Sequence, residues 1–127
     1  MAPRLPIRAL LLFEALTFIA ASLVHFGVLV HGYEHEGARI PEGIIAIVLL
    51  AGLTATFIRS ARTTEAAIAA QGFALLGTLV GAFTVITGAG PQTLPDILYH
   101  AGILAVLAWG LFFAVNARKM AASPVRL

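Results

Sequence analysis

Four long apolar stretches constrain this chain more than any other feature. They cover residues 7–30, 41–58, 64–87 and 95–116, and each approaches the length of about 20 residues that a helix needs to cross a bilayer. Because no water reaches the backbone inside lipid, such stretches must satisfy their own hydrogen bonds and therefore fold as helices. Short connections make consecutive helices neighbours. We therefore predict an all-α fold, a four-transmembrane-helix up-down-up-down bundle, with residues 1–127 forming a single integral membrane domain.

The composition excludes several classes of protein. Hydrophobic residues make up 60% of the chain and charged residues 11%, which is far from the composition of soluble domains. The chain has no cysteine, so disulfides, thiolate metal sites and iron–sulfur clusters are excluded. The basic residues sit at helix ends, so we predict the lipid bilayer and no nucleic acid as partner. Assembly as a homo-oligomer or within a larger membrane complex is compatible with this size.

The basic residues also predict an orientation. One end of the predicted bundle carries Arg4, Arg8, Arg59, Arg62, Arg118, Lys119 and Arg126, whereas the other end carries only Arg39. By the positive-inside rule, both termini are cytoplasmic in a multi-pass protein, which we assign to a bacterial cytoplasmic (inner) membrane. A cleavable signal peptide is the rival interpretation of the first stretch. The apolar run continues beyond its small residues, which favours a retained helix.

All four histidines are predicted to lie at the outward end. His25 and His100 come from the first and fourth helices at similar depth, which resembles the arrangement of small bundle cytochromes. Such a pair is what a b-type haem or a buried divalent metal requires. Asp96 lies four residues before His100, so its carboxylate is expected either to orient that imidazole or to cap the helix. The alternative is that each histidine only hydrogen-bonds a nearby hydroxyl, carbonyl or water.

The outward loop carries a second candidate site. The segment from His31 to His35, with Glu34 between them, matches the H-x-x-E-H pattern of the inverzincin zinc peptidases. Those enzymes carry the pattern on a helix, whereas Gly32 and Gly37 weaken a helix here. A surface metal site for Zn²⁺, Cu²⁺ or Ni²⁺ formed by His31, Glu34 and His35 is therefore preferred to peptidase chemistry. The alternative is a solvated polar loop.

Glu14 is the one carboxylate in the middle of an apolar stretch. Gln71 lies at a comparable depth on the third predicted helix, so the two side chains are expected to hydrogen-bond across the bundle. A four-helix protein with a glutamate in its first helix is similar to the small multidrug exporters, and that resemblance implies a proton-coupling role for Glu14. The structural alternative, which we favour here, is a polar pair that fixes the register of two helices.

Three functions follow from these candidates. The first is a membrane-bound binding or electron-transfer module that holds haem or a divalent metal near the outer face through His25 and His100. The second is a proton-coupled small-molecule transporter that uses Glu14. The third is a non-catalytic accessory subunit of a larger membrane complex, in which the polar residues only satisfy one another. Whether the chain is an enzyme is left open by the sequence.

Overall fold

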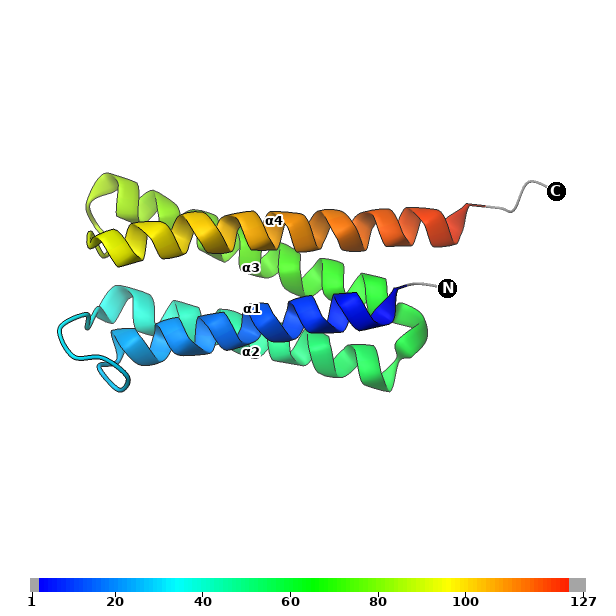
Figure 1. Cartoon of the computed structure of the whole chain (residues 1–127), viewed down its shortest axis with the longest axis horizontal. Helices are drawn as coiled ribbons and strands as arrows, with labels where there is room; N and C mark the ends of the chain where they lie inside the picture. Colours follow the sequence, from blue (N-terminus) through cyan, green and yellow to red (C-terminus); the bar gives the residue numbers. More distant parts are fainter. Residues whose placement is uncertain (1–2, 124–127) are drawn as a thin grey trace.

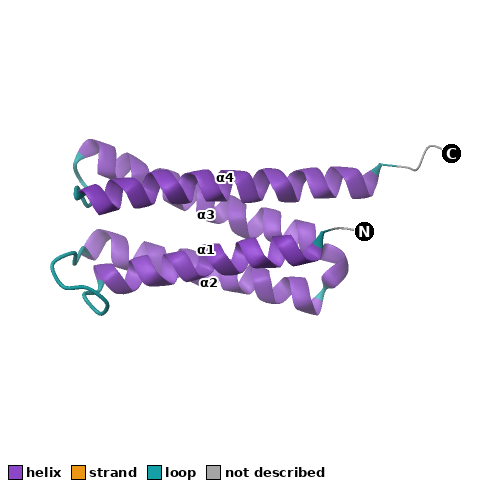
Figure 2. Cartoon of the chain, viewed as in Figure 1, coloured by secondary structure: helices purple, strands orange, loops and turns teal. Residues whose placement is uncertain are grey.

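The chain is all-helical over the residues that the structure describes. A computed structural model describes residues 3–123 (Figures 1 and 2). Its elements are α1 (Arg4–His25), α2 (Glu36–Ile58), the short 3-10 helix η1 (Ser60–Arg62), α3 (Thr63–Thr87) and α4 (Leu94–Ala122). The prediction of an all-α chain with four long helices is therefore confirmed. Of the basic residues used to predict orientation, Arg126 lies outside the described residues.

The four helices form a bundle with different loops at its two ends. Figure 1 shows both ends of the chain, together with the α2–α3 connection, at one end of the bundle. The α1–α2 loop and the α3–α4 loop lie at the other end, which is called the loop end below. Packing is extensive between α1 and α2, between α2 and α3, and between α3 and α4, but much sparser between α1 and α4. The bundle is therefore least closed along the α1–α4 seam.

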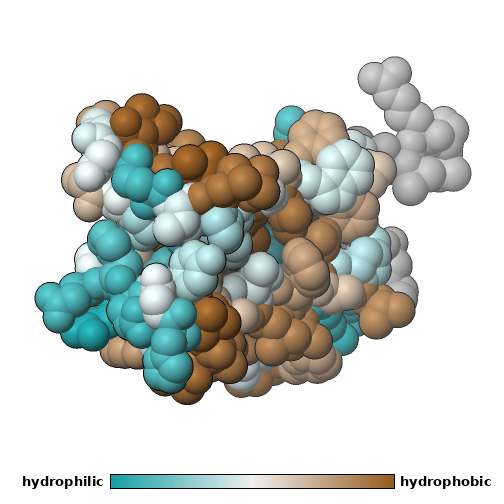
Figure 3. All heavy atoms as spheres, turned by 60° about the vertical axis from the view of Figure 1, so that its left-hand side comes forward, coloured by the Kyte–Doolittle hydropathy of each residue, from teal (hydrophilic) through white to brown (hydrophobic). Residues whose placement is uncertain are grey.

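The bundle exposes many large apolar side chains, while its interior combines large apolar side chains such as Phe18 and Leu107 with small and polar ones. Its interior includes several alanines and ten buried polar or charged residues, namely Glu14, Ser22, His25, Glu42, Thr56, Thr63, Thr64, Gln71, Thr78 and Asp96. The outside carries exposed side chains such as Phe83, Ile86 and Trp109. Figure 3 shows hydrophilic residues gathered toward the loop end and hydrophobic residues along the body. All four helices are long and apolar enough to cross a membrane, as in a multi-pass membrane protein.

Helix α1 ends five residues earlier than the hydropathy predicts. The N–H of Gly27 donates to the carbonyl of Val24, and the N–H of Val28 donates to the carbonyl of Leu23, both at 2.9 Å. Gly27 has a φ of 74°, a left-handed conformation that glycine adopts without steric cost. These two bonds form a Schellman motif, which satisfies the last carbonyls and stops the helix. The apolar residues 28–30 lie in the loop that follows.

Helix α2 begins at Glu36, five residues before the predicted start at Pro41. Pro41 is the sixth residue of the helix, where it removes the hydrogen bond to Gly37 and its ring crowds the carbonyl of that residue. The α1–α2 loop therefore covers residues 26–35 instead of the predicted 31–40, with its length unchanged, and His35 becomes the residue before the helix. At the other end of the chain, α4 continues to Ala122 rather than stopping near Asn116. That extension consists mainly of good helix formers, which prolong a helix after its apolar part has ended.

Candidate functional site at the loop end

A buried histidine lies between two carboxylates at the loop end of the bundle. His25 is the last residue of α1 and only 3% exposed. Its Nδ1 lies 2.6 Å from Oε2 of Glu42 on α2, and its Nε2 lies 3.1 Å from Oδ1 of Asp96 on α4. Ionised carboxylate oxygens only accept hydrogen bonds, so an imidazolium that donates from both nitrogens satisfies this arrangement. The three side chains join three helices through buried charge-assisted hydrogen bonds.

The first turn of α4 holds Asp96 in place. Thr93 is the N-cap residue, and its side chain accepts a hydrogen bond from the backbone N–H of Asp96. In return, the Asp96 carboxylate accepts hydrogen bonds from the N–H and the hydroxyl of Thr93, which completes a capping box. Asp96 thus takes part in a helix cap, one of the two roles expected from its position. The same carboxylate reaches across to His25 with its other oxygen.

His100 makes its hydrogen bond to the backbone carbonyl of Asp96 rather than to the Asp96 carboxylate. The Nδ1 of His100 lies 2.8 Å from the Asp96 carbonyl oxygen, one helical turn earlier. A carbonyl can only accept, so Nδ1 must carry the proton. In the neutral ring, Nε2 is then an acceptor. That nitrogen lies over Gly81 of α3, where an added Cβ would approach it to 3.2 Å.

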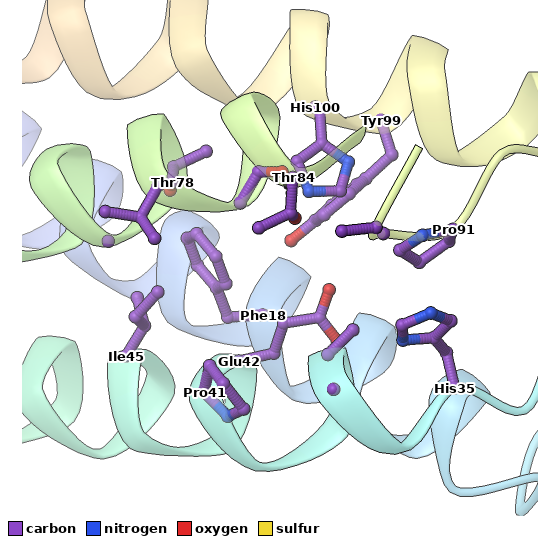
Figure 4. A pocket seen from close by; sticks show the side chains of 17 residues that line it. Phe18, His35, Pro41, Glu42, Ile45, Thr78, Thr84, Pro91, Tyr99 and His100 are labelled. Atoms are coloured by element: carbon purple, nitrogen blue, oxygen red, sulfur yellow. Dashed lines mark hydrogen bonds between the residues drawn. The ribbon is translucent and has the colours of Figure 1, made fainter. Parts of the chain in front are cut away.

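A cavity of about 170 Å³ lies beside this cluster. It is lined from all four helices and from the α3–α4 loop (Figure 4), and its lining residues include Phe18, Glu42, Thr84, Tyr99 and His100. Most of the lining is apolar. Figure 4 shows the Glu42 carboxylate and the Tyr99 hydroxyl approaching the cavity from opposite sides. The Tyr99 ring is fixed by edge-to-face contacts with Phe18 and His100.

Several buried polar atoms of this lining have no partner within the described residues. They are Oε1 of Glu42, the hydroxyl oxygen of Tyr99 and Nδ1 of His35. Glu42 itself is only 6% exposed, with one oxygen on His25 and the other unpaired. Leaving a buried polar atom unpaired costs about 1–3 kcal/mol. The cavity therefore presents hydrogen-bonding groups that the described chain does not use.

The structure divides the three predicted loop metal ligands into an exposed His31–Glu34 pair and a separate His35. His31 and Glu34 are both exposed, with Nδ1 of His31 3.5 Å from Oε1 of Glu34. Hydrogen bonds from backbone N–H groups, its own and that of Gly32, hold the pKa of the Glu34 carboxyl below its usual value. His35 instead lies against the His25 ring, at a centroid distance of 6.3 Å. Within residues 3–123 there is no group of three or more His, Asp or Glu side chains placed to hold a metal ion.

Glu14 and Gln71 meet in the middle of the bundle. Nε2 of Gln71 donates to both carboxylate oxygens of Glu14, at 2.9 and 3.1 Å, and Glu14 is fully buried. Gly110 of α4 makes room for this pair. A Cβ added at Gly110 would lie 2.2 Å from Nε2 of Gln71 and 2.7 Å from Oε1 of Glu14. The pair therefore occupies the space left by the missing side chain of Gly110.

The sequence pointed to some members of the loop-end site and missed others. His25, His100 and Asp96 were candidates, but the direct His25–Asp96 contact was not predicted. Glu42 and Tyr99 were not among the candidates, because Glu42 falls in the first turn of a helix that starts at residue 41, where the helix dipole already favours a carboxylate. The available signal for Glu42 was a carboxylate directly followed by an uninterrupted apolar run.

Comparisons of the chain with protein-family models, with curated proteins and with solved structures give no match in any of the three. The geometry of the site is therefore the basis for assigning a function.

Proposed function

We propose that this chain is an integral protein of the bacterial cytoplasmic membrane that binds a small molecule from the outer side. Its four helices cross the membrane in up-down-up-down order, with both termini cytoplasmic. The loop end of the bundle then faces outward, and the cavity beside His25 and Glu42 is the ligand site. The positive-inside rule supports this orientation, because the described basic residues other than Arg39 belong to the opposite end.

The observation that carries the proposal is the unpaired Oε1 of Glu42 in the cavity lining. A carboxylate inside a membrane domain is expensive and is a functional candidate by default. A purely structural carboxylate would have both oxygens satisfied by the protein. Here one oxygen is used by His25 and the other is available beside the Tyr99 hydroxyl. An apolar pocket with a few convergent polar groups is the usual form of a small-molecule site.

Two functions considered from the sequence are not part of this proposal. Haem or metal ligation by His25 would require a free ring nitrogen, whereas both nitrogens lie within hydrogen-bonding distance of carboxylates. Proton coupling through Glu14 would require contact with a cavity. Glu14 does not line any of the three main cavities in the described part of the chain.

The orientation and the accessibility of the cavity can be tested by single-cysteine labelling, because the chain has no cysteine of its own. Thr84 lines the cavity, Glu36 is exposed at the loop end, and Ala61 is exposed at the opposite end. We expect Glu36→Cys and Thr84→Cys to react in intact cells with a membrane-impermeant maleimide. Ala61→Cys should react only after the membrane is permeabilised.

Phe83→Cys is the matched control for the cavity position. Phe83 is adjacent to Thr84 but is 65% exposed on the lipid-facing surface, so its thiol should be shielded by lipid and remain unlabelled. Labelling of Ala61→Cys instead of Glu36→Cys in intact cells would show that the protein has the opposite orientation in the membrane. Labelling of Glu36→Cys without Thr84→Cys would show that the cavity is closed to the outer side.

A further inference from the structure

We infer that the ligand of the loop-end cavity is a small amine, bound as an ammonium ion, whose apolar body is about the size of one aromatic ring. This inference depends on the proposed function, since it names the class of molecule that the same cavity would take. It is argued from the hydrogen-bonding character, the charge and the size of the cavity.

The unpaired polar groups around the cavity can all accept hydrogen bonds, including Nδ1 of His35, which accepts in one of the two neutral tautomers. Oε1 of Glu42 accepts, and Nε2 of His100 accepts because its Nδ1 donates to the Asp96 carbonyl. The Tyr99 hydroxyl is unpaired and can accept as well as donate. No hydrogen bond joins Glu42 to Tyr99 within the described residues, although both line the same cavity. A ligand group with several N–H donors, such as an ammonium, would satisfy these acceptors.

The charge around the cavity has the sign that an ammonium needs. The His25 imidazolium lies between the two carboxylates of Glu42 and Asp96, so the three groups together carry one net negative charge when both acids are ionised. The residues that line the cavity include no lysine or arginine. A cation entering the cavity would neutralise this negative charge. An anion would be repelled by it and would find no lysine or arginine to pair with.

The size and the apolar lining define the rest of the ligand. A cavity of about 170 Å³ is close to the roughly 150 Å³ that accommodates benzene in an apolar protein interior. Phe18, Ile45 and the ring of Pro91 supply apolar surface to contact such a body. A benzylamine-sized molecule therefore matches both the volume and the distribution of polar atoms.

A free amine is preferred to the ammonium of a phosphatidylethanolamine headgroup. The headgroup carries a phosphate two carbons from its nitrogen, and a phosphate in this apolar cavity would need a basic partner. Arg39, the basic residue at the loop end, instead bonds Glu36 and lies over the ring of Phe26. The described cavity thus matches the ammonium but not the phosphate.

Calorimetric titration of the full-length protein in detergent provides the test, with benzylamine, benzyl alcohol and benzoate as probes of equal ring size. We expect benzylamine to bind at least about tenfold more tightly than benzyl alcohol, and benzoate to give no measurable binding. Glu42→Gln should weaken benzylamine binding by at least about tenfold, since a charged hydrogen bond is lost. Tyr99→Phe, which removes one hydroxyl and keeps the ring, should weaken it by about two- to tenfold.

Glu36→Gln is the matched control, because Glu36 is a carboxylate on the same helix that lies outside the cavity; it should bind benzylamine like the wild type. If Glu42→Gln fails to fold, Tyr99→Phe still tests the site. Equal binding of benzyl alcohol and benzylamine would overturn the amine inference while leaving a ligand site in place. The amine inference would also be overturned, with the ligand site left in place, if no probe binds although the Thr84→Cys variant is labelled from outside.

Two further outcomes separate the remaining possibilities. If none of the probes binds and Thr84→Cys also resists labelling, the proposed ligand site itself is refuted. To distinguish a free amine from a lipid headgroup, the benzylamine titration is repeated in nanodiscs of phosphatidylcholine and of phosphatidylethanolamine. Equal affinity in both supports a free amine, whereas competition by phosphatidylethanolamine would assign the cavity to the headgroup.

Discussion

Replacing His25 by alanine is expected to lower the free energy of unfolding by about 3–5 kcal/mol, the cost of removing one partner from a buried ion pair. His25 contacts both Glu42 and Asp96 inside the bundle. Its loss leaves two carboxylates facing one another across an apolar interior without a cation. The measurement is unfolding of the purified protein in mixed micelles with increasing dodecyl sulfate, followed by far-ultraviolet circular dichroism.

Two further variants test whether unpaired charge causes the loss of stability in His25→Ala. His31→Ala changes a histidine whose side chain is 91% exposed in the loop, and it should unfold like the wild type. Adding Glu42→Gln and Asp96→Asn to His25→Ala should recover a substantial part of the lost stability, because no charge is then left unpaired. If this triple variant is no more stable than His25→Ala alone, packing rather than charge holds the three helices together at this position.

Gly110→Ala is expected to lower the free energy of unfolding by up to about 2 kcal/mol, because leaving a buried polar group unsatisfied carries a penalty of about 1–3 kcal/mol and better helix propensity offsets about 1. The added methyl group would occupy the space of the Gln71 amide and displace it from Glu14. Alanine favours a helix by about 1 kcal/mol over glycine, so the observed loss is the net of two opposing effects. The dodecyl sulfate titration used for His25→Ala measures it.

Gly102→Ala is the matched control, being the same substitution on the same helix. A Cβ at Gly102 would have no neighbour within 4 Å among the described residues, so only the gain in helix propensity should appear. We expect a protein as stable as the wild type or up to about 1 kcal/mol more stable. Equal stability of the two variants would mean that α4 moves away at little cost and that the Glu14–Gln71 pair tolerates it.

The hydropathy of the chain predicted four helices because the length of each apolar stretch is set by the bilayer. The helix ends depended on backbone conformation and capping hydrogen bonds, which hydropathy does not describe. Residues 28–30 are apolar yet follow the left-handed Gly27, so α1 stops before them. Pro41 suggested a helix start, but the observed helix continues for five residues before it, despite the lost hydrogen bond and the crowding that proline causes beyond the first turn.

The incorrect helix start at Pro41 is also the reason why Glu42 was not predicted as a member of the site. With a start at Pro41, Glu42 belongs to the first turn and needs no other explanation than the helix dipole. With the observed start at Glu36, Glu42 lies in the second turn and faces His25. The depth of each polar residue could be predicted from its position along a helix. Its partners could not, because the rotation of one helix against the next depends on packing of the whole bundle.

Helix α1 is fixed to the α3–α4 half of the bundle by two polar contacts at different heights. Glu14 bonds Gln71 and His25 contacts Asp96. His25 lies eleven positions after Glu14, which corresponds to about 16 Å along the helix. Either contact alone would leave α1 free to pivot. Together they prevent both rotation about the helix axis and sliding along it, so any motion that opens the α1–α4 seam must break at least one buried polar contact.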